Sequence, residues 1–451
     1  MEEIILNLLE EKNFRKIKEI LIEEMPADVA AEFEKMENDT RMRLFRLLPK
    51  DEAADVFAFL SLDTQKELIL SLAAKEAGEV IDNLFADDAT DLLEEMPAGV
   101  VKKILSNASV ETRREINSLL KYPESSAGSV MTVEYVDLKK DITVIDAISK
   151  IRRVGVDKET IDVCYVLDEG RHLLGIVSLR QLVLAHEDDI IGEIMEENVI
   201  SVSTLDDQEF VAREFTKYDF TTMPVVDSEN RLVGIITVDD VVDIIEKEAT
   251  EDIEMMAGIT PSDKPYMKTG VFELFLKRFP WLAILMISAT FTGLIMSSFE
   301  KKLQAMVVLA SFIPMLMGTG GNSGSQSSVS VIRAISLDEV SFGDIFKVVF
   351  KEMRVSILCG LALGVVNFGK MMLIDRVLFN NPAVTVAVGV VVSLTMVVTV
   401  LCAKLIGAVL PLVAKKVGFD PAVMASPFIT TLTDAISLIV YFTIASSLLN
   451  L

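Results

Sequence analysis

Five long apolar stretches in the second half of the chain constrain its fold more than any other feature of the sequence. After Lys277 the composition turns apolar, and each stretch can hold the roughly 20 residues that an α-helix needs to cross a bilayer. The predicted spans are residues 281–298, 305–330, 345–373, 384–413 and 425–449. Because lipid offers the backbone no hydrogen bonds, these stretches predict an all-α transmembrane domain of five helices.

The basic residues near the ends of these spans predict their orientation. Placing the N-terminus inside the cell leaves eight Lys and Arg residues in inner loops and three in outer loops. The inner set is Lys277, Arg278, Arg333, Lys347, Lys351, Arg354, Lys415 and Lys416, and the outer set is Lys301, Lys302 and Arg376. Because basic loops stay on the cytosolic side, we expect a multi-pass plasma-membrane protein with a cytosolic N-terminus and an external C-terminus.

Charge separates the two halves of the chain. From residue 266 onward there are 9 Asp and Glu against 14 Lys and Arg, whereas the whole chain has 68 against 43. The preceding residues therefore carry 59 acids and 29 bases. A surface this acidic argues against nucleic-acid binding and calls for cations. The three cysteines have no metal-type spacing, and the first residues lack a secretory signal, so a cytosolic front half is expected.

The first 125 residues read as short helices in a repeat. Turn signals recur about every twelve residues, from Pro26 to Pro97, and apolar residues follow each at helical intervals. Units this short cannot bury their own apolar faces, so they should stack into a superhelix. An irregular helical bundle is the alternative.

The next segment is a tandem duplication of strands and helices. Strands are expected at residues 163–168 and 173–178 in the first copy, and at 223–227 and 232–237 in the second. Gly175 and Gly234 lie 59 residues apart, and each begins a Gly-Ile-X-Ser/Thr step into a helix. The order, length and junction resemble a pair of cystathionine-β-synthase (CBS) modules. That resemblance implies an α/β fold and a nucleotide site at Thr237 and Asp240, although Gln181 replaces the acid in the first module.

Asp434 is the only charged residue in the last predicted span, between residues 425 and 451. A carboxylate at membrane depth costs several kcal/mol unless it faces protein or water. Thr430, Thr431, Ser437 and Tyr441 fall on the same helical face, which predicts a water-filled ion pathway. The alternative is a structural ion pair between Asp434 and either Lys404 or Lys370.

The second predicted span contains a run of small and polar residues from Gly318 to Ser328. Such density in a membrane helix predicts either close backbone approach between helices or an unwound stretch that lines a cavity. It is not a nucleotide loop, because no Gly-Lys-Ser/Thr follows.

No enzyme is predicted. The two histidines are isolated, and the sequence contains no Cys/His ligand cluster, nucleophile elbow or Walker loop.

The whole chain resembles the MgtE family of Mg²⁺ channels and transporters. The residues that carry the resemblance are Thr319-Gly320-Gly321-Asn322, Tyr218-Asp219-Phe220, Thr237-Val238-Asp239-Asp240, Glu248-Ala249-Thr250-Glu251-Asp252-Ile253, Asp420-Pro421-Ala422 and Thr431-Leu432-Thr433-Asp434. The domains expected from it are a helical superhelix at 1–125, CBS modules at 126–188 and 189–247, an acidic connector or plug helix at 248–276 and a pore domain at 277–451.

The resemblance also implies a mechanism. Two copies of the chain would form a pore in which Asp434 from each holds a hydrated Mg²⁺, with Thr430, Asn322 and Asp420 along the pathway. Cytosolic Mg²⁺ would close the pore by binding a sensor made of Asp87, Asp91, Asp207, Glu209, Asp219, Asp240, Asp243, Glu248, Glu251 and Asp252. Hard divalent cations favour such oxygen ligands. For any one of these acids, a solvated surface position is the alternative.

The expected function is therefore Mg²⁺ uptake, with Mg²⁺ as both substrate and regulator and ATP as a second candidate ligand. Many members of the family have Asn where this chain has Ser325 and Ser426, which weakens any carry-over of ion selectivity. Two alternatives remain. One is a membrane-anchored metal or nucleotide sensor that transports nothing, and the other is a broader transporter of Mn²⁺ or Co²⁺. An exporter is disfavoured because its membrane part usually precedes the CBS modules.

Overall fold

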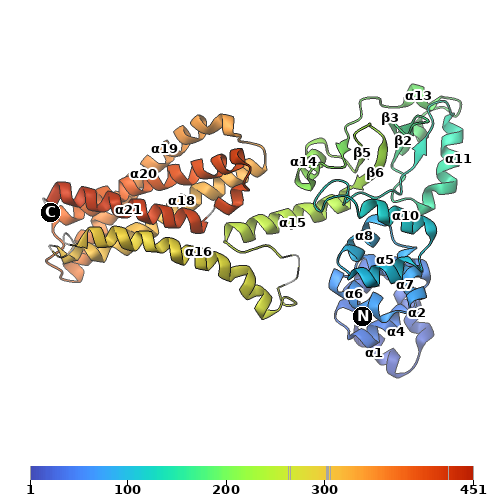
Figure 1. The fold of residues 1–451 in the computed structure, drawn as a ribbon, viewed down its shortest axis with the longest axis horizontal. Coiled ribbons are helices and arrows are strands. Elements are labelled where there is room, and N and C mark those ends of the chain that lie inside the picture. Colours follow the sequence, from blue (N-terminus) through green and yellow to red (C-terminus); the bar gives the residue numbers. More distant parts are fainter. Residues whose placement is uncertain are drawn as a thin grey trace. The chain divides into compact units, whose positions relative to one another are not determined.

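The computed structural model describes residues 2–262, 264, 266–300, 304, 306–424 and 426–449. Lys301, Lys302, the span limits at 305 and 425 and the last two residues lie outside this description. The chain divides into two compact units, residues 1–245 and 246–451, which are described in turn (Figure 1).

The first unit begins with ten short helices. They are α1 (Glu2–Glu10), α2 (Phe14–Glu23), α3 (Pro26–Glu34), α4 (Asn38–Phe45), α5 (Lys50–Ala58), α6 (Leu62–Ser71), α7 (Ala74–Ile81), α8 (Ala86–Glu94), α9 (Ala98–Leu105) and α10 (Val110–Leu119). From α2 to α10 each helix starts twelve residues after the one before. Alternate helices pack on each other, as in α3 on α5 and α4 on α6, and one apolar core runs from Ile5 to Ile116. This confirms the predicted helical repeat.

The rest of the first unit is a duplicated α/β fold. The first copy contains β1 (Asp137–Leu138), α11 (Val144–Val154), β2 (Val163–Leu167), β3 (Leu173–Ser178) and α12 (Leu179–Leu184). The second contains α13 (Ile191–Ile194), β4 (Val202–Ser203), α14 (Gln208–Tyr218), β5 (Thr222–Val226), β6 (Leu232–Thr237) and α15 (Val238–Met256). Each sheet has its middle strand parallel to the first and antiparallel to the third.

Gly175 and Gly234, the matching glycines of the two copies, are required for the same structural reason. A Cβ on Gly175 would lie 2.9 Å from the carbonyl oxygen of Glu196, and one on Gly234 would lie 2.6 Å from that of Thr132. In each copy another segment of backbone bridges to the third strand at this point. Glycine is needed because backbone approaches backbone there.

The second unit is helical. After the end of α15 it contains α16 (Val271–Ser298), α18 (Ile313–Ser336), α19 (Ile345–Lys370), α20 (Val386–Val417) and α21 (Ser426–Leu449). Short 3₁₀ turns, η2 (Val307–Phe312), η3 (Phe342–Asp344) and η5 (Pro421–Met424), precede α18, α19 and α21, and a π-helix, η4 (Met371–Leu378), extends α19. Within the described residues, each of the five predicted spans contains a long helix. Helix α16 begins ten residues before the predicted start of the first span at 281, so it includes residues 271–276 of the predicted connector.

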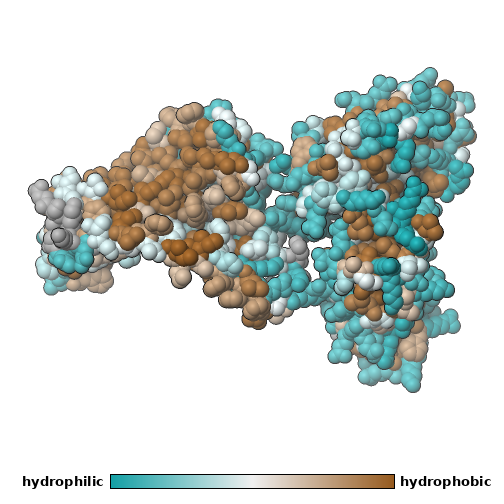
Figure 2. All heavy atoms as spheres, viewed as in Figure 1, coloured by the Kyte–Doolittle hydropathy of each residue, from teal (hydrophilic) through white to brown (hydrophobic). Residues whose placement is uncertain are grey.

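Within the described residues, four helices are long and apolar enough to cross a membrane: 271–298, 342–378, 386–417 and 421–449. Helix α18 falls short of that apolarity because glycine, serine and amide side chains fill its middle. It nevertheless packs extensively against α20 and α21, and Ser323, Ser327 and Ser328 are buried, whereas Asn322 and Gln326 remain exposed. Figure 2 shows hydrophobic side chains over the surface of this unit, as expected for a domain that faces lipid.

Candidate ion pathway and cation sites

Asp434 lies in the middle of α21, one carboxylate on an otherwise uncharged helix. Its Oδ1 atom is buried and has no hydrogen-bond partner among the described residues. The ion-pair alternative does not occur: Lys370 instead binds Asp375 at 2.9 Å, and Lys404 donates to the hydroxyl of Ser327 at 3.5 Å. An unpaired carboxylate oxygen at membrane depth is costly, so this atom calls for a cation or water.

The predicted polar face around Asp434 is only partly right. Ser437 is 1% exposed and donates to the carbonyl of Thr433 at 2.6 Å. Tyr441 is fully buried, and its hydroxyl donates to the carbonyl of Leu309 at 3.0 Å. These two side chains therefore pack inside the protomer and do not line a watery pathway. Thr430, by contrast, is only half-buried and lies against Gly321 of α18.

The glycines of α18 serve helix packing. The helix is continuous from Ile313 to Ser336, so the unwound stretch considered from the sequence is wrong. A Cβ on Gly324 would lie 2.7 Å from the Ile429 side chain, and one on Gly407 of α20 would lie 2.1 Å from the carbonyl oxygen of Gly324. Small residues thus let α18, α20 and α21 approach closely, which holds α21, the helix that carries Asp434, against α18.

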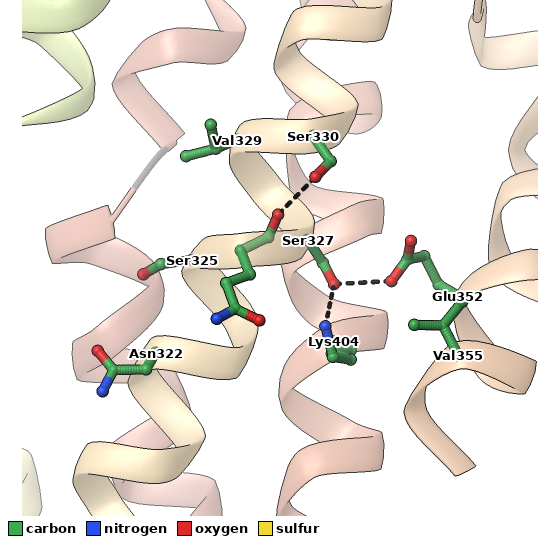
Figure 3. A pocket seen from close by; sticks show the side chains of 9 residues that line it. Asn322, Ser325, Ser327, Val329, Ser330, Glu352, Val355 and Lys404 are labelled. Carbon is green, nitrogen blue, oxygen red and sulfur yellow. Dashed lines mark hydrogen bonds between the residues drawn. The ribbon is translucent and has the colours of Figure 1, made fainter. Parts of the chain in front are cut away.

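Two further residues of the predicted pathway are accessible. Asn322 is exposed on the polar side of α18, where it lines an open groove (Figure 3). Asp420 is also exposed, and its Oδ1 accepts a hydrogen bond from the backbone of Ala422 at 2.7 Å, which shapes the turn before α21. Both side chains can therefore meet a hydrated ion.

A cluster of acidic side chains forms inside the first unit, between the helical repeat and the CBS modules. Asp87 and Asp88 from α8 meet Asp240 from α15 and Glu159 from the loop after η1. Asp239, Glu134 and Asp91 add further negative charge around them. Of these, Asp88, Glu134, Glu159 and Asp239 were not among the predicted sensor residues.

The pKa values of the acids in this cluster are raised by burial and, to a smaller extent, by repulsion between the carboxylates. Burial first, and repulsion from Asp240 second, raise the pKa of Asp88 to about 7 and that of Glu159 to about 8. Burial raises the pKa of Asp240 to about 6, although Thr237 partly offsets this by donating to its Oδ2 at 2.6 Å. The pKa of Asp87 is likewise raised, chiefly by burial. Asp88 keeps exposed surface and is better screened by water than Glu159, whose Oε2 is buried without a partner.

The other predicted sensor acids of the first unit have local roles. Asp207 begins α14 by accepting from the backbone of Glu209 at 2.9 Å, and Glu209 pairs with Arg213 at 3.2 Å. Asp219 ends the same helix in a left-handed conformation with φ 54°. Asp243 lies one turn after Asp240 and adds to its repulsion.

The remaining predicted sensor acids, Glu248, Glu251 and Asp252, lie on the part of α15 that belongs to the second unit. Asp252 accepts from the hydroxyl of Ser336 at 3.4 Å, which joins this part of α15 to the end of α18. The helix stops at Met256, and Gly258 follows with φ 72°. Nowhere in the described residues do three or more acids, histidines or cysteines already close around a metal position.

The predicted nucleotide residues Thr237 and Asp240 bond to each other at the start of α15. In the first module Ser178 and Gln181 make the corresponding cap, with the Ser178 backbone donating to Gln181 at 2.7 Å. A neutral amide thus stands where the second module has a carboxylate.

Comparison with known proteins relates every part of the chain to magnesium transport. Residues 313–444 match the family model described as MgtE, divalent cation transporter, residues 24–125 match the MgtE intracellular N domain, and residues 127–188 and 191–247 match CBS domains. The magnesium transporter MgtE of Thermus thermophilus is 40% identical over 98% of this chain and 97% of its own length. That of Bacillus subtilis is 33% identical over 99% and 97%.

Solved structures agree with these relatives. The cytosolic domain of the Mg²⁺ channel MgtE in complex with ATP is 38% identical, with a TM-score of 0.52 over 54% of this chain and all of that chain. The soluble part of a magnesium transporter is 32% identical, with a TM-score of 0.53 over 55% of this chain and 98% of that chain. The expectation that the chain is not an enzyme accords with the transporter class of its relatives.

Proposed function

This chain belongs to the MgtE family of magnesium transporters, multi-pass proteins of the membrane, and from that premise we propose that it is a Mg²⁺-selective channel gated by cytosolic Mg²⁺. Uptake is passive, through a pore formed at the contact of two copies of the chain. The N-terminus lies in the cytosol and the C-terminus outside, so that the acidic unit meets cytosolic ions. Fusion of a reporter enzyme to either end of the chain tests this orientation.

The buried, unpartnered Oδ1 of Asp434 carries the proposal. A single carboxylate cannot surround an ion, but two copies facing each other supply two charges to a Mg²⁺ that keeps most of its water. Such a site favours divalent over monovalent ions, because the two charges repel each other unless a divalent ion neutralises them. Thr430 and Asn322 offer further oxygens along the pathway, and Asp420 attracts ions at the cytosolic end of α21.

Uptake by the purified chain in liposomes, followed with an internal Mg²⁺-sensitive dye, tests the pathway. Asp434→Asn keeps the size of the side chain and removes its charge, and we expect uptake to fall at least about tenfold. Thr443→Ala on the same helix is the control, because that side chain is exposed and two turns away. Unchanged uptake by Asp434→Asn would remove this residue from the pore. Competition by Mn²⁺ or Co²⁺ in the same assay separates a Mg²⁺-selective channel from a broader transporter.

Gating follows from the acidic cluster of Asp87, Asp88, Asp240 and Glu159. Without cations these groups repel one another, which loosens the contact between the helical repeat and the CBS modules. Bound Mg²⁺ would cancel the repulsion, hold the start of α15 in place and, through α15, oppose opening of the pore. The predicted acids Asp91, Asp207, Glu209, Asp219, Asp243, Glu248, Glu251 and Asp252 complete the sensor.

Proteolysis of the connector, residues 248–276, tests the gating step. We expect millimolar Mg²⁺ to protect it in the wild type and to protect it less in a Glu159→Gln variant. Indifference of the cleavage rate to Mg²⁺ would contradict a Mg²⁺ sensor. If the protein responded to Mg²⁺ in this assay but carried no ion in liposomes, it would be a membrane-anchored sensor instead.

A second ligand, ATP, is proposed at the second CBS module, because the cytosolic domain of a relative has been solved with ATP. Thr237 is the last residue of β6 and donates to Asp240 in the first turn of α15, where a ribose hydroxyl could replace this internal hydrogen bond. Titration of the chain with a fluorescent ATP analogue, before and after Thr237→Val, measures this. Absence of saturable binding by the wild type would refute it.

A further inference from the structure

A polar groove in the membrane unit contains two charged residues that the proposed pathway does not use. It has a volume of about 770 Å³ and is bordered by α18, α19 and α20. Ser327 of α18 lies between the two charges: its hydroxyl donates to Glu352 Oε2 at 2.7 Å and accepts from Lys404 Nζ at 3.5 Å. Figure 3 shows both charged side chains converging on this serine from separate helices.

The charges of this group are only loosely satisfied. Lys404 is 6% exposed, yet its one hydrogen bond within the described residues, to Ser327 at 3.5 Å, is long for an ammonium group. Among the described residues, neither Lys404 nor Glu352 has an ion-pair partner within 4.0 Å, so the serine separates the charges instead of joining them. Because a charge at membrane depth is costly unless it is well paired, a purely structural role predicts a tighter contact than this one.

The rest of the groove offers oxygen atoms to a cation. Asn322, Ser325 and Gln326 border it from α18, and Glu352 borders it from α19. Amide, hydroxyl and carboxylate oxygens suit Mg²⁺, which often binds through one or two carboxylates and keeps its remaining waters. Six waters occupy roughly 180 Å³ at about 30 Å³ each, so the groove has room for a hydrated ion. Asp434 does not border it.

We propose that Glu352 is the carboxylate of a second divalent-cation site in this groove, and that Lys404, joined to Glu352 only through Ser327, competes with the ion for the charge of Glu352. The proposal rests on the function proposed above. An arriving ion replaces the Ser327 hydroxyl as the partner of Glu352 and takes over from Lys404 in balancing its charge, and the contacts through Ser327 form again when the ion departs. The lysine thus weakens binding at this site, which favours release of an ion passing through.

The concentration of Mg²⁺ that gives half-maximal uptake in liposomes tests the proposal. Glu352→Gln should raise this concentration about tenfold, the effect of losing one charged contact, and Lys404→Met should lower it by a similar factor. In the Glu352→Gln background, Lys404→Met should have no further effect, because the charge for which Lys404 and the ion compete is absent. Asp338→Asn and Lys415→Met are matched controls, since they remove the same charges from an ion pair of 3.8 Å at the helix ends.

Three outcomes separate the possibilities. Opposite shifts in the two single variants, absent from the controls, support the site. If both single variants need the same Mg²⁺ concentration for half-maximal uptake as the wild type, and only maximal uptake or thermal stability falls, then Glu352 and Lys404 are structural. That result overturns the inference and leaves the proposed pore at Asp434 unaffected. If the wild-type chain itself carries no Mg²⁺ into liposomes, the proposed function has failed.

Discussion

Glu159→Gln should stabilise the first unit of the protein, and only where the pH is high enough for the glutamate to ionise. The pKa of Glu159 rises from 4.5 to about 8 in the folded chain. At 1.36 kcal/mol per pKa unit this corresponds to an upper limit of about 5 kcal/mol. Since the side chain is half-buried and water screens part of its repulsion, we expect about 2 kcal/mol.

The sign follows from which state loses its proton first. Below pH 4.5 the carboxyl is protonated in both the folded and the unfolded chain, so the variant gains nothing. Between pH 4.5 and 8 the unfolded chain ionises first, so rising pH lowers the free energy of unfolding of the wild type. Above pH 8 the penalty is constant. The glutamine variant has no such penalty over this range.

Urea denaturation of a fragment spanning residues 1–245, at pH 5 and at pH 8.5, measures the difference. Glu197→Gln is the control, because its side chain is exposed in the same part of the unit. Millimolar Mg²⁺ at pH 8.5 should stabilise the wild type more than Glu159→Gln, since ion binding relieves the same repulsion. A gain that is equal at both pH values, or a loss of stability at pH 8.5, would refute the electrostatic reasoning.

Three further predictions concern packing and capping. Gly407→Ala should destabilise the membrane unit by roughly 1–3 kcal/mol in thermal unfolding in detergent, because its Cβ would lie 2.1 Å from a backbone oxygen of α18, whereas Gly293→Ala, with open space around it, should be neutral or stabilising. Tyr441→Phe should cost about 1–2 kcal/mol in the same assay without changing the Mg²⁺ concentration for half-maximal uptake, since its hydroxyl bonds to the backbone inside the protomer. Asp207→Ala should lower the free energy of unfolding of residues 1–245 by about 1 kcal/mol in urea denaturation, because the N-cap of α14 is lost. If Mg²⁺ also no longer slowed proteolysis of the connector in this variant, a sensor role for Asp207 would be favoured.

Part of the candidate site could be predicted from individual residues of the sequence. Asp434 stands out because an ionisable residue is rare in a membrane span, and its isolation needed no tertiary information. Ser437 and Tyr441 were assigned to the pathway by helical spacing alone, and this was wrong. Helical spacing predicts which residues share a face of α21. Whether that face meets protein or water depends on the neighbouring elements, and here η2 contacts Tyr441 and α18 contacts Ser437.

The sequence by itself determined the features that repeat along the chain. The twelve-residue period of the short helices, the duplicated α/β modules and the apolar spans are each encoded by local patterns, because helix length, strand alternation and hydrophobicity act over a few residues. Tertiary structure alone brought Glu159 to Asp88 and placed Ser327 between Glu352 and Lys404. Those residues are distant in sequence, and their charges interact only because packing of separate elements holds them together where water cannot fully screen them.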